Sequence, residues 1–574
     1  MGQYQPTQLI RYSPDAVASY YRFRPWRVWA RAIKIVWYFA GFILGLKSDE
    51  WFDRVEQNKL KRATQLRMML TKLGPTFIKV GQALSTRPDL IRKDFLEELV
   101  KLQDQLPPFD SDLAYRIIEA QLGQSISEVY SDLSLKPVAA ASLGQVYRGR
   151  LAATGEEVAV KVQRPNLRPT LTLDLYLMRW AASWLSPWLP LNLGHDLTLI
   201  VDEFGTKLFE EIDYLNEARN AEKFASNFRN EPTVKVPRIY WRQTTNRVLT
   251  LEWINGFKLN DTKAIREAGL DPEAIVQIGV TAGLQQLLEH GFFHADPHPG
   301  NLFATPDGRM AYIDFGMMDQ LNETTKETLV DSVVHLTNKE YTDLAIDFVN
   351  LGFLTPDTDI RPIIPALETV LGDAIGKNVG DFNFKTVTDQ FSELMYEYPF
   401  RVPAKFALII RSLVTQEGIA LSLNRNFKII EVAYPYVARR LLTGESPQLR
   451  RRLLNILFKD GKFQWQRLEN LISIARTDNS FDVLPTAKLG IRYLMSDEGK
   501  FLRRQLVLAL TEDDRLHTEE VQRLWNLVKD DLQPERILSA AIGVLTEFSK
   551  EGVAAILPKA PMFAVFEKPK TGNR

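Results

Sequence analysis

The sequence contains no cysteine in 574 residues. Disulfides, thiolate nucleophiles and cysteine-ligated zinc or iron–sulfur sites are therefore excluded, and a reducing compartment is favoured. An excess of charge is also missing, because Lys and Arg together number 71 and so do Asp and Glu. No overall field would attract nucleic acid, so we expect no nucleic-acid partner. The length allows several domains, and 45% hydrophobic residues is ordinary for globular proteins.

Long apolar runs are scarce as well. Residues 35–46 form an apolar stretch near the N-terminus that is shorter than the roughly 18 residues a membrane-spanning helix needs. Arg27, Arg31 and Lys34 precede or flank this stretch and share one helical face, whereas Trp29 falls elsewhere. A basic, tryptophan-rich amphipathic helix is typical of an interfacial membrane anchor. The alternative is a helix that packs on the protein's own surface.

The most informative pattern begins with Phe-His-Ala-Asp-Pro-His-Pro-Gly-Asn at residues 293–301 and continues with Asp-Phe-Gly at residues 314–316. In a kinase-type site, the first carboxylate, Asp296, orients or deprotonates the attacking hydroxyl group. Asn301 and Asp314 would hold Mg²⁺ against nucleotide phosphates, because a hard cation prefers oxygen ligands. The apolar residues after Asn301 and before Asp314 predict two short strands joined by an Asp-Gly turn.

Histidines in the same stretch support a different interpretation. His290, His294 and His298 are spaced by four, with Asp296 among them. Imidazole and carboxylate ligands of this kind could form a metallohydrolase site. Prolines at positions 297 and 299 prevent one helix from presenting all three histidines on a face, which favours the kinase-type interpretation.

Upstream, residues 138–150 predict a strand, a turn and a strand, and residues 157–162 predict a further strand that carries Lys161. This is the order found in a kinase small lobe, where the lysine pairs with the α- and β-phosphates. Alanines at residues 139–141 occupy the loop where glycines are usual, and alanine allows fewer backbone conformations. Residues 247–254 predict a strand leading into a linker whose backbone groups would hold an adenine.

Carboxylates that could pair with such lysines follow at residues 210–217. A helical stripe of apolar residues runs through this segment: Phe204, Leu208, Ile212 and Leu215. An acidic helix face is usually solvated, but Lys161 and an upstream residue, Lys79, both need carboxylate partners. Residues 56–106 predict two helices around a sharp segment at 73–82, with Lys79 and Gln82 on one face. Gly81 between them would permit another backbone to approach closely.

The segment after Gly316 lacks the features of an ordinary protein kinase. There is no long polar activation segment and no Ala-Pro-Glu sequence, and residues 323–349 already predict a helix. We expect residues 320–480 to be helical throughout, apart from a break at 400–403. Residues 537–557 predict an apolar C-terminal helix that packs on the large lobe or contacts lipid.

In combination, these motifs resemble the UbiB (aarF-domain) family of atypical protein-kinase-like enzymes over about residues 55–330. The motifs that carry the resemblance are Lys79-Val80-Gly81-Gln82, Ala139-Ala140-Ala141-Ser142, Val158-Ala159-Val160-Lys161, Glu211-Ile212-Asp213-Tyr214 with Glu217, His294-Ala295-Asp296-Pro297-His298-Pro299-Gly300-Asn301 and Asp314-Phe315-Gly316.

The resemblance implies an α+β, protein-kinase-like fold of two lobes. The small lobe would contain an antiparallel sheet, and the large lobe would be helical, with helical extensions at both ends. The expected segments are a basic, aromatic possible membrane anchor (1–50), a helical extension (51–135), the small lobe (136–255), the large lobe (256–480) and a C-terminal helical extension (481–574).

The resemblance also implies a role for each site residue. Lys161 would pair with Glu217 and act in catalysis with Asp296, while Asn301 and Asp314 would bind Mg²⁺. ATP or ADP would lie against a surface that includes Lys161 and the following residues: Ala139, Ala140, Ala141, Ser142, Val146, Ala159, Glu252 and Ile254. The extension would gate the site through four further residues: Lys79, Gln82, Glu211 and Asp213.

The implied function is a Mg²⁺-dependent, ATP-binding atypical kinase or ATPase that supports prenylquinone (ubiquinone, plastoquinone or tocopherol-type) or other isoprenoid-lipid metabolism. It would act peripherally on the cytoplasmic or stromal side of a membrane, with prenyl-lipid or quinone precursors and lipid-biosynthesis proteins as partners. The alternatives are a nucleotide-switched, pseudokinase-like scaffold and an orthodox protein kinase, which the missing activation segment disfavours.

Overall fold

The structure, a computed structural model, divides into two compact units, residues 1–433 and 434–574. It describes residues 11–85, 92–102, 107–185, 197–375, 401–423 and 429–443, and isolated residues or short pieces between 398 and 516. In this second unit, the described strands form two short pairs, β12 (Phe458–Lys459) with β13 (Lys462–Phe463) and β14 (Thr511–Glu512) with β15 (Arg515–Leu516). The predicted helix at 537–557 lies outside the described residues, and the predicted domain boundaries stay predictions.

The small lobe contains a five-stranded sheet in the order β1-β3-β4-β6, with β2 paired to β3. All of its pairs are antiparallel. The strands are β1 (Tyr130–Leu133), β2 (Ala139–Ala140), β3 (Gly144–Leu151), β4 (Glu157–Gln163) and β6 (Val248–Glu252). Alternating valines of β4 pack in one cluster with α6 (Ser111–Leu122) and the short helix α7 (Ile126–Val129), so burial of branched side chains holds this sheet to its helices.

The extension before this sheet contains one helix more than expected, because the segment at 73–82 is mostly helical. Helices α3 (Val55–Leu73), α4 (Pro75–Leu84) and α5 (Lys93–Leu99) replace the two predicted ones. Gly74 ends α3 with φ 105°, and Pro75 begins α4, where the missing N–H costs nothing. Gly81 is approached by side chains rather than by a backbone, since a Cβ there would collide with Cδ1 of Leu102.

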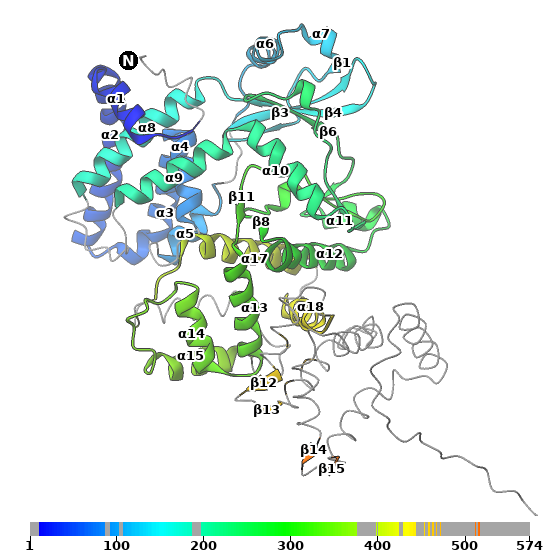
Figure 1. Ribbon diagram of the computed structural model, residues 1–574. Helices are drawn as coiled ribbons and strands as arrows, with labels where there is room; N and C mark the ends of the chain where they lie inside the picture. The colour runs from blue at the N-terminus through cyan, green and yellow to red at the C-terminus, as the bar shows by residue number, and fades with distance from the viewer. Residues whose placement is uncertain are drawn as a thin grey trace, which may run out of the picture. The chain divides into compact units, whose positions relative to one another are not determined.

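A fully buried carboxylate joins the extension to the next helix, α8 (Leu167–Leu185). Asp174 on α8 accepts hydrogen bonds from Arg31 Nε at 2.7 Å and from Arg31 Nη2 at 2.9 Å. Thr76 at the start of α4 donates to the same carboxylate at 2.7 Å. Arg31 belongs to α2 (Pro25–Trp51), which follows α1 (Pro14–Arg22). Helices α2, α4 and α8 therefore meet at Asp174. Figure 1 shows these helices gathered beside α8 and α9.

Helix α2 packs on the protein with one face and exposes apolar side chains on the other. Phe42 is buried in a cluster with Leu70 and Phe77 of the neighbouring helices. The exposed large apolar side chains of α2 are Trp26, Trp29, Ile33, Val36, Trp37, Ile43, Leu44, Leu46 and Trp51. The helix is therefore docked on the body, as the second alternative expected, and contact of its exposed aromatic face with a membrane stays a prediction.

The sequence analysis expected this segment to be too short to span a membrane. That expectation was wrong, because the helix is longer than the apolar run on which it was based. Among the described residues, α2 is the one helix long and apolar enough to cross a membrane by those two criteria. The uninterrupted apolar run at 35–46 underestimated it, because the helix extends for 27 residues and includes apolar side chains on both sides of that run. Length and composition alone do not show a spanning helix.

Two segments that were expected as single helices are each broken in two. Helix α9 (Leu197–Glu211) ends before Asp213, whose side chain accepts from Leu215 N at 3.1 Å and begins α10 (Tyr214–Asn227). The apolar stripe that continues across the break concealed this cap, since Asp favours N-cap positions. Similarly, α13 (Glu323–Thr337) and α14 (Tyr341–Asn350) are separated at Lys339, which has φ 59°.

The large lobe has a second, four-stranded sheet in the order β5-β10-β9-β7 and a two-stranded pair of β8 with β11. These strands are β5 (Val234–Lys235), β7 (Phe257–Lys258), β8 (Phe292–His294), β9 (Leu302–Ala304), β10 (Met310–Tyr312) and β11 (Met318–Gln320). The predicted Asp-Gly turn joins β9 to β10, and Gly308 there has φ 79°.

The chain after β7 is mostly helical. Besides α13 and α14, its helices are α11 (Thr262–Glu267), α12 (Pro272–Gln285), α15 (Ile363–Ile375), α17 (Ala404–Leu423) and α18 (Ile429–Thr443). The expectation of helix throughout 320–480 was wrong in detail, because residues 351–362 form turns and β12 and β13 are strands. In Figure 1, α17 lies next to α12 beneath β8 and β11.

We predict that Asp174→Ala lowers the free energy of unfolding by about 3–5 kcal/mol, because it leaves the Arg31 guanidinium in the interior without its carboxylate. Urea unfolding followed by circular dichroism measures this. Glu56→Gln, which removes the exposed pairs of Glu56 with Lys59 and Arg92, is the control and should leave the free energy of unfolding nearly unchanged. Equal effects of the two substitutions would contradict the structural role of Asp174.

Candidate active site

The hairpin of β9 and β10 brings two motifs to one place. Leu302 pairs with Tyr312, and Ile313 N donates to Asn301 O at 3.2 Å. Asn301 therefore lies at the end of the hairpin from which Asp314 emerges, although thirteen residues of sequence separate the two. An amide oxygen and a carboxylate at one end of a hairpin are a donor set that suits a hard divalent cation.

His294 connects the same two motifs. Its Nδ1 accepts a hydrogen bond from Asp296 N at 3.1 Å, so its Nε2 carries the proton and donates to Asp314 O at 2.9 Å. Burial lowers the pKa of His294, against the raising effect of the nearby carboxylates, and so favours this neutral form. The imidazole thus fixes the backbone of both candidate catalytic carboxylates instead of binding a metal.

Three charged side chains from separate elements meet beside this hairpin. Lys161 on β4 donates to Glu217 on α10 at 2.8 and 2.9 Å, and to Asp314 at 3.3 Å. Glu217 lies in the first turn of α10, where the Asp213 cap begins the helix. The break between α9 and α10, which the apolar stripe concealed, therefore positions the carboxylate that faces the strand lysine.

The charges in this group depend on one another. Burial lowers the pKa of Lys161, but the carboxylates of Asp314 and Glu217 outweigh burial and hold that pKa well above its usual value. Burial raises the pKa of Asp314, but Lys161 and the Gly316 N–H outweigh it and lower that pKa to about 2. Burial, reinforced by the charge of Asp314, raises the pKa of Glu217 although Lys161 opposes this. Asp314 is therefore the more readily ionised carboxylate of the two.

Helix α10 also holds the Asp-Phe-Gly segment in place. Asp314 Oδ1 accepts from Gly316 N at 2.9 Å, and Asn220 of α10 donates to Phe315 O at 3.1 Å. The Phe315 ring is buried, with its centroid 5.3 Å from that of Phe224 on the same helix. A single helix thus positions both Glu217 and Asp314.

The predicted gating residues occupy the junction of the extension and α9. Lys79 of α4 forms a buried ion pair with Glu211 at the end of α9. Glu211 is also close to the Asp-Phe-Gly segment, since a Cβ on Gly316 would lie 3.6 Å from its Cγ. Gln82 donates to Leu102 O at 2.7 Å, and Asp213 caps α10. The structure therefore joins Lys79 to Glu211 next to the candidate site.

The predicted nucleotide-binding residues lie on neighbouring strands. In the sheet register, Val146 is opposite both Ala139 and Lys161, and Ala159 is opposite Leu251. The turn from β2 to β3 is tight, with Ala141 N donating to Gly144 O at 2.8 Å, and Ser142 beside it is buried.

At the end of β6, Glu252 pairs with Lys235 at 2.7 Å, and Ile254 follows in the linker. The Glu252 side chain therefore binds a lysine of the second sheet. The roles of all these residues in binding a nucleotide stay predictions.

Sequence reasoning missed one charged residue of the site. Arg411 on α17 forms an ion pair with Asp296, and its side chain is only 14% exposed. Two sequence signals were available: Arg411 interrupts an apolar helical segment, and no Lys or Arg occurs between residues 291 and 308. Neither signal identifies the partner, because the contact joins segments that are distant in the sequence.

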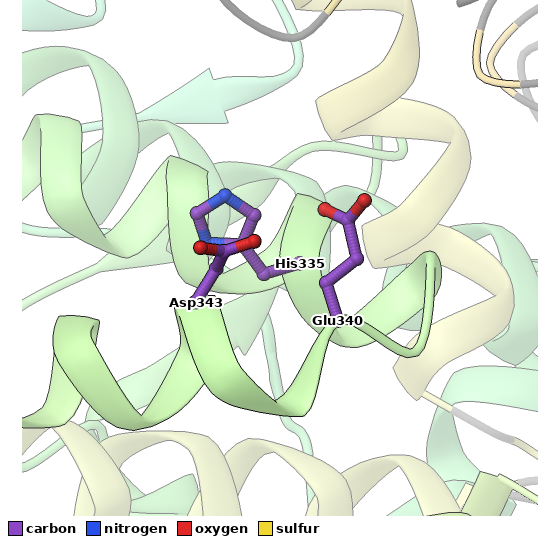
Figure 2. Close-up of side chains that lie close together, drawn as sticks. All are labelled: His335, Glu340 and Asp343. Carbon is purple, nitrogen blue, oxygen red and sulfur yellow. The ribbon is translucent and has the colours of Figure 1, made fainter. Parts of the chain in front are cut away.

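The metallohydrolase alternative is not supported by the described residues. Both ring nitrogens of His294 are engaged by backbone groups, and His298 Nδ1 accepts from Gly300 N at 3.1 Å. Among the described residues, the side chains that lie close enough together to share a metal ion are instead those of His335, Glu340 and Asp343 (Figure 2). These residues lie where α13 passes into α14, and His335 Nδ1 pairs with Asp347 at 2.8 Å.

Comparison with known proteins identifies the family. Residues 101–347 match the ABC1 atypical kinase-like domain, and residues 367–428 match the UbiB helical domain. An uncharacterized protein of Synechocystis sp. is 70% identical over 96% of this chain and 97% of its own length. The chain belongs to the ABC1/UbiB family of atypical kinase-like proteins.

Other members of the ABC1/UbiB family are more distant. Protein ACTIVITY OF BC1 COMPLEX KINASE 1, chloroplastic, of Arabidopsis thaliana is 48% identical over 91% of this chain and 79% of its own length. A solved structure of a Mycobacterium tuberculosis protein in complex with erythromycin is 28% identical, with a TM-score of 0.45, and covers 66% of this chain and 95% of its own. The matches to the two family models and to the plant relative confirm the family resemblance, and with it the two-lobe, α+β kinase-like fold.

The pKa of Asp314 leads to a test of this charge group. A carboxylate whose pKa is lowered by folding adds stability above its unfolded pKa, near 3.8, and loses it as the pH falls through about 2. Asp314→Asn should therefore destabilise the protein most above about pH 4, and the difference from wild type should shrink as the pH falls. Unfolding by urea at a series of pH values measures this. A difference that stays constant would show that Asp314 is not the ionised partner of Lys161.

Proposed function

We propose that this protein is a Mg²⁺-dependent, ATP-binding atypical kinase or ATPase. The observation that supports this most is the meeting of Lys161, Glu217 and Asp314 at distances of 2.8 to 3.3 Å. A strand lysine oriented by a helix glutamate is the arrangement that kinase-like proteins use to hold nucleotide phosphates. When phosphates pair with Lys161 in place of Asp314, the Asp314 carboxylate would be available to bind a cation.

The residues at the end of the hairpin fit a magnesium ion by their chemistry. Asn301 and Asp314 would hold it, and bound Mg²⁺ would neutralise negative charge on the phosphates. Asp296 would orient the attacking hydroxyl group and accept its proton. His294, which contacts the backbone of both carboxylate residues, would maintain their separation during the reaction.

A small or lipid substrate fits this site better than a protein substrate does. The chain passes from β11 directly into α13, whose cap is Asn322, so the described structure has no activation segment. The Lys79–Glu211 pair holds α4 against the end of α9 beside the Asp-Phe-Gly segment. We propose that this pair gates the site, and that Gln82 and Asp213 support it by anchoring α4 and starting α10.

We further propose a peripheral location on a membrane, where prenylquinone or related isoprenoid lipids are metabolised. Support comes from the aromatic, outward face of α2, on which Trp37 is 78% exposed, and from Arg27 and Lys34 beside it. Tryptophan and basic side chains together favour the interface of an anionic bilayer. Because Arg31 and Phe42 hold the opposite face to the body, α2 would lie in the interface while docked.

The named plant relatives agree with such a setting without defining it. Two of them in Arabidopsis thaliana are described as chloroplastic kinases, and the related Synechocystis protein is 70% identical to this chain. We propose the cytoplasmic or stromal side of a membrane for this protein. Its partners would be lipid-biosynthesis proteins and prenyl-lipid or quinone precursors.

We predict that the purified protein hydrolyses ATP with Mg²⁺, and that liposomes containing a phenolic prenylquinone precursor raise the rate. Asp296→Asn should lower kcat by at least about 100-fold, because it removes the group that accepts the proton. Phosphate release measures the turnover, and Asp307→Asn, in the distant hairpin turn, is the control. ATP binding without turnover under every condition would favour a nucleotide-switched scaffold, and full activity of Asp296→Asn would refute its role.

A separate prediction concerns the membrane. Replacing Trp26, Trp29 and Trp37 together by Ser should weaken partitioning onto anionic liposomes by about 100-fold or more, because three large apolar surfaces then leave the bilayer interface. Flotation of the full chain measures this. Leu135→Ser removes an equally exposed apolar side chain from the small lobe and should have little effect. Unchanged flotation of the triple variant would exclude α2 as the membrane-binding surface.

A further inference from the structure

Asp296 has a positively charged partner that its own loop does not supply. The loop contains no Lys or Arg, and its histidines are occupied, since Nδ1 of both His294 and His298 accepts from a backbone N–H. Phosphoryl transfer spreads negative charge over the moving group, and preorganised cations stabilise that charge. The loop itself therefore supplies no Lys or Arg for this purpose, and any such side chain comes from elsewhere in the chain.

Arg411 occupies the required position. It forms an ion pair with Asp296, whose side chain is 27% exposed, and it reaches the loop from α17, which packs along α12. The contact between these helices is close, because a Cβ on Gly283 of α12 would collide with the side-chain amide of Gln416. Ser412 and Gln416 on the same helix are buried. The guanidinium is therefore delivered by a helix whose position is fixed by packing.

The chemistry of Arg411 suits an anion in addition to Asp296. A guanidinium has five N–H donors, is always charged, and binds phosphate in a forked geometry while it keeps a second partner. Lys161 is engaged differently, because its ammonium already faces two carboxylates, Glu217 and Asp314. The two cations approach the candidate site from different lobes.

We propose that Arg411 binds the terminal phosphoryl group of the nucleoside triphosphate and stabilises it during transfer, an inference that rests on the proposed function. The oxygen of a hydroxyl group or water attacks the terminal phosphorus, and its proton passes to Asp296. The bond from that phosphorus to the bridging oxygen breaks, and its electron pair leaves with the nucleoside diphosphate. Arg411 balances the charge of the moving group, and Asp296 holds the guanidinium beside the acceptor.

The proposal assigns a catalytic part to the helical segment. Arg411 lies outside the residues that match the kinase-like domain, 101–347, and inside those that match the helical domain, 367–428. The site is then complete only when both segments are present. Arg411 would also make the site bind ATP more tightly than ADP, because ADP lacks the phosphoryl group that Arg411 would bind.

The test compares the affinities of the full chain for ATP and ADP with Mg²⁺, measured by calorimetry. Arg411→Gln should weaken ATP binding about 10- to 100-fold and leave ADP binding nearly unchanged, the range expected for a charged hydrogen bond. Arg411→Lys should restore part of the preference. Lys405→Gln removes a cation from the same helix, where Lys405 donates to Gln320 O, and should change neither affinity. In turnover, Arg411→Gln should lower kcat by about 1,000-fold.

A second pair of variants guards against misfolding. The double variant Asp296→Asn, Arg411→Gln removes both charges of the pair and so leaves neither without its partner, and the single variant Asp296→Asn, which keeps Arg411, is its reference. The single variant should keep its preference for ATP over ADP, and the double variant should lose it. If the double variant keeps its preference for ATP over ADP, or if Arg411→Gln turns over faster than wild type, the role of Arg411 is refuted while the proposed function still stands. A wild-type protein that does not bind Mg²⁺ and ATP would overturn the proposed function as well.

Discussion

One buried ammonium group organises the candidate site. Lys161 comes from the small-lobe sheet, Glu217 from α10 and Asp314 from the end of the hairpin in the large lobe. Among the ion pairs given for the described residues, this is the one that links all three elements. Without the lysine charge, two carboxylates would face each other in a buried setting, which is strongly unfavourable. The ion pairs of Lys161 therefore help to fix the position of one lobe on the other. The same group that would bind phosphates also holds the described arrangement together.

Much of this site could be predicted from sequence because its chemistry is local. The hairpin carries its own turn signal, and its two strands of three residues each fix the ends on which Asn301 and Asp314 lie. The breaks at Asp213 and Lys339 were missed for the opposite reason: apolar periodicity continues through them, and a single cap or left-handed residue outweighs it. Helix α2 was misjudged because an apolar run was counted without the helix around it. Arg411 could not be placed, since no sequence pattern reports which distant carboxylate a buried arginine meets.

The histidine of the catalytic loop illustrates how a motif can mislead when its residue types are considered alone. Three histidines at regular spacing suggested metal ligands, yet the ring of His294 is saturated by two backbone groups. A neutral imidazole that accepts at Nδ1 and donates at Nε2 acts as a fixed spacer between Asp296 and Asp314. Burial lowers the pKa of His294, so the imidazole stays neutral and keeps the spacing of the two carboxylates down to a lower pH than an exposed histidine would.

The ion pair between Arg411 and Asp296 has an evolutionary consequence. Both side chains of the pair are partly withdrawn from water, so loss of either one leaves the other without its opposite charge. Selection should therefore act on the two positions together, and an exchange of the helical segment between relatives would succeed only where the loop is compatible. A catalytic loop that does not carry its own cation can accept the two prolines on either side of His298, which stiffen its path. The kinase-like and helical segments would then be inherited as one functional unit.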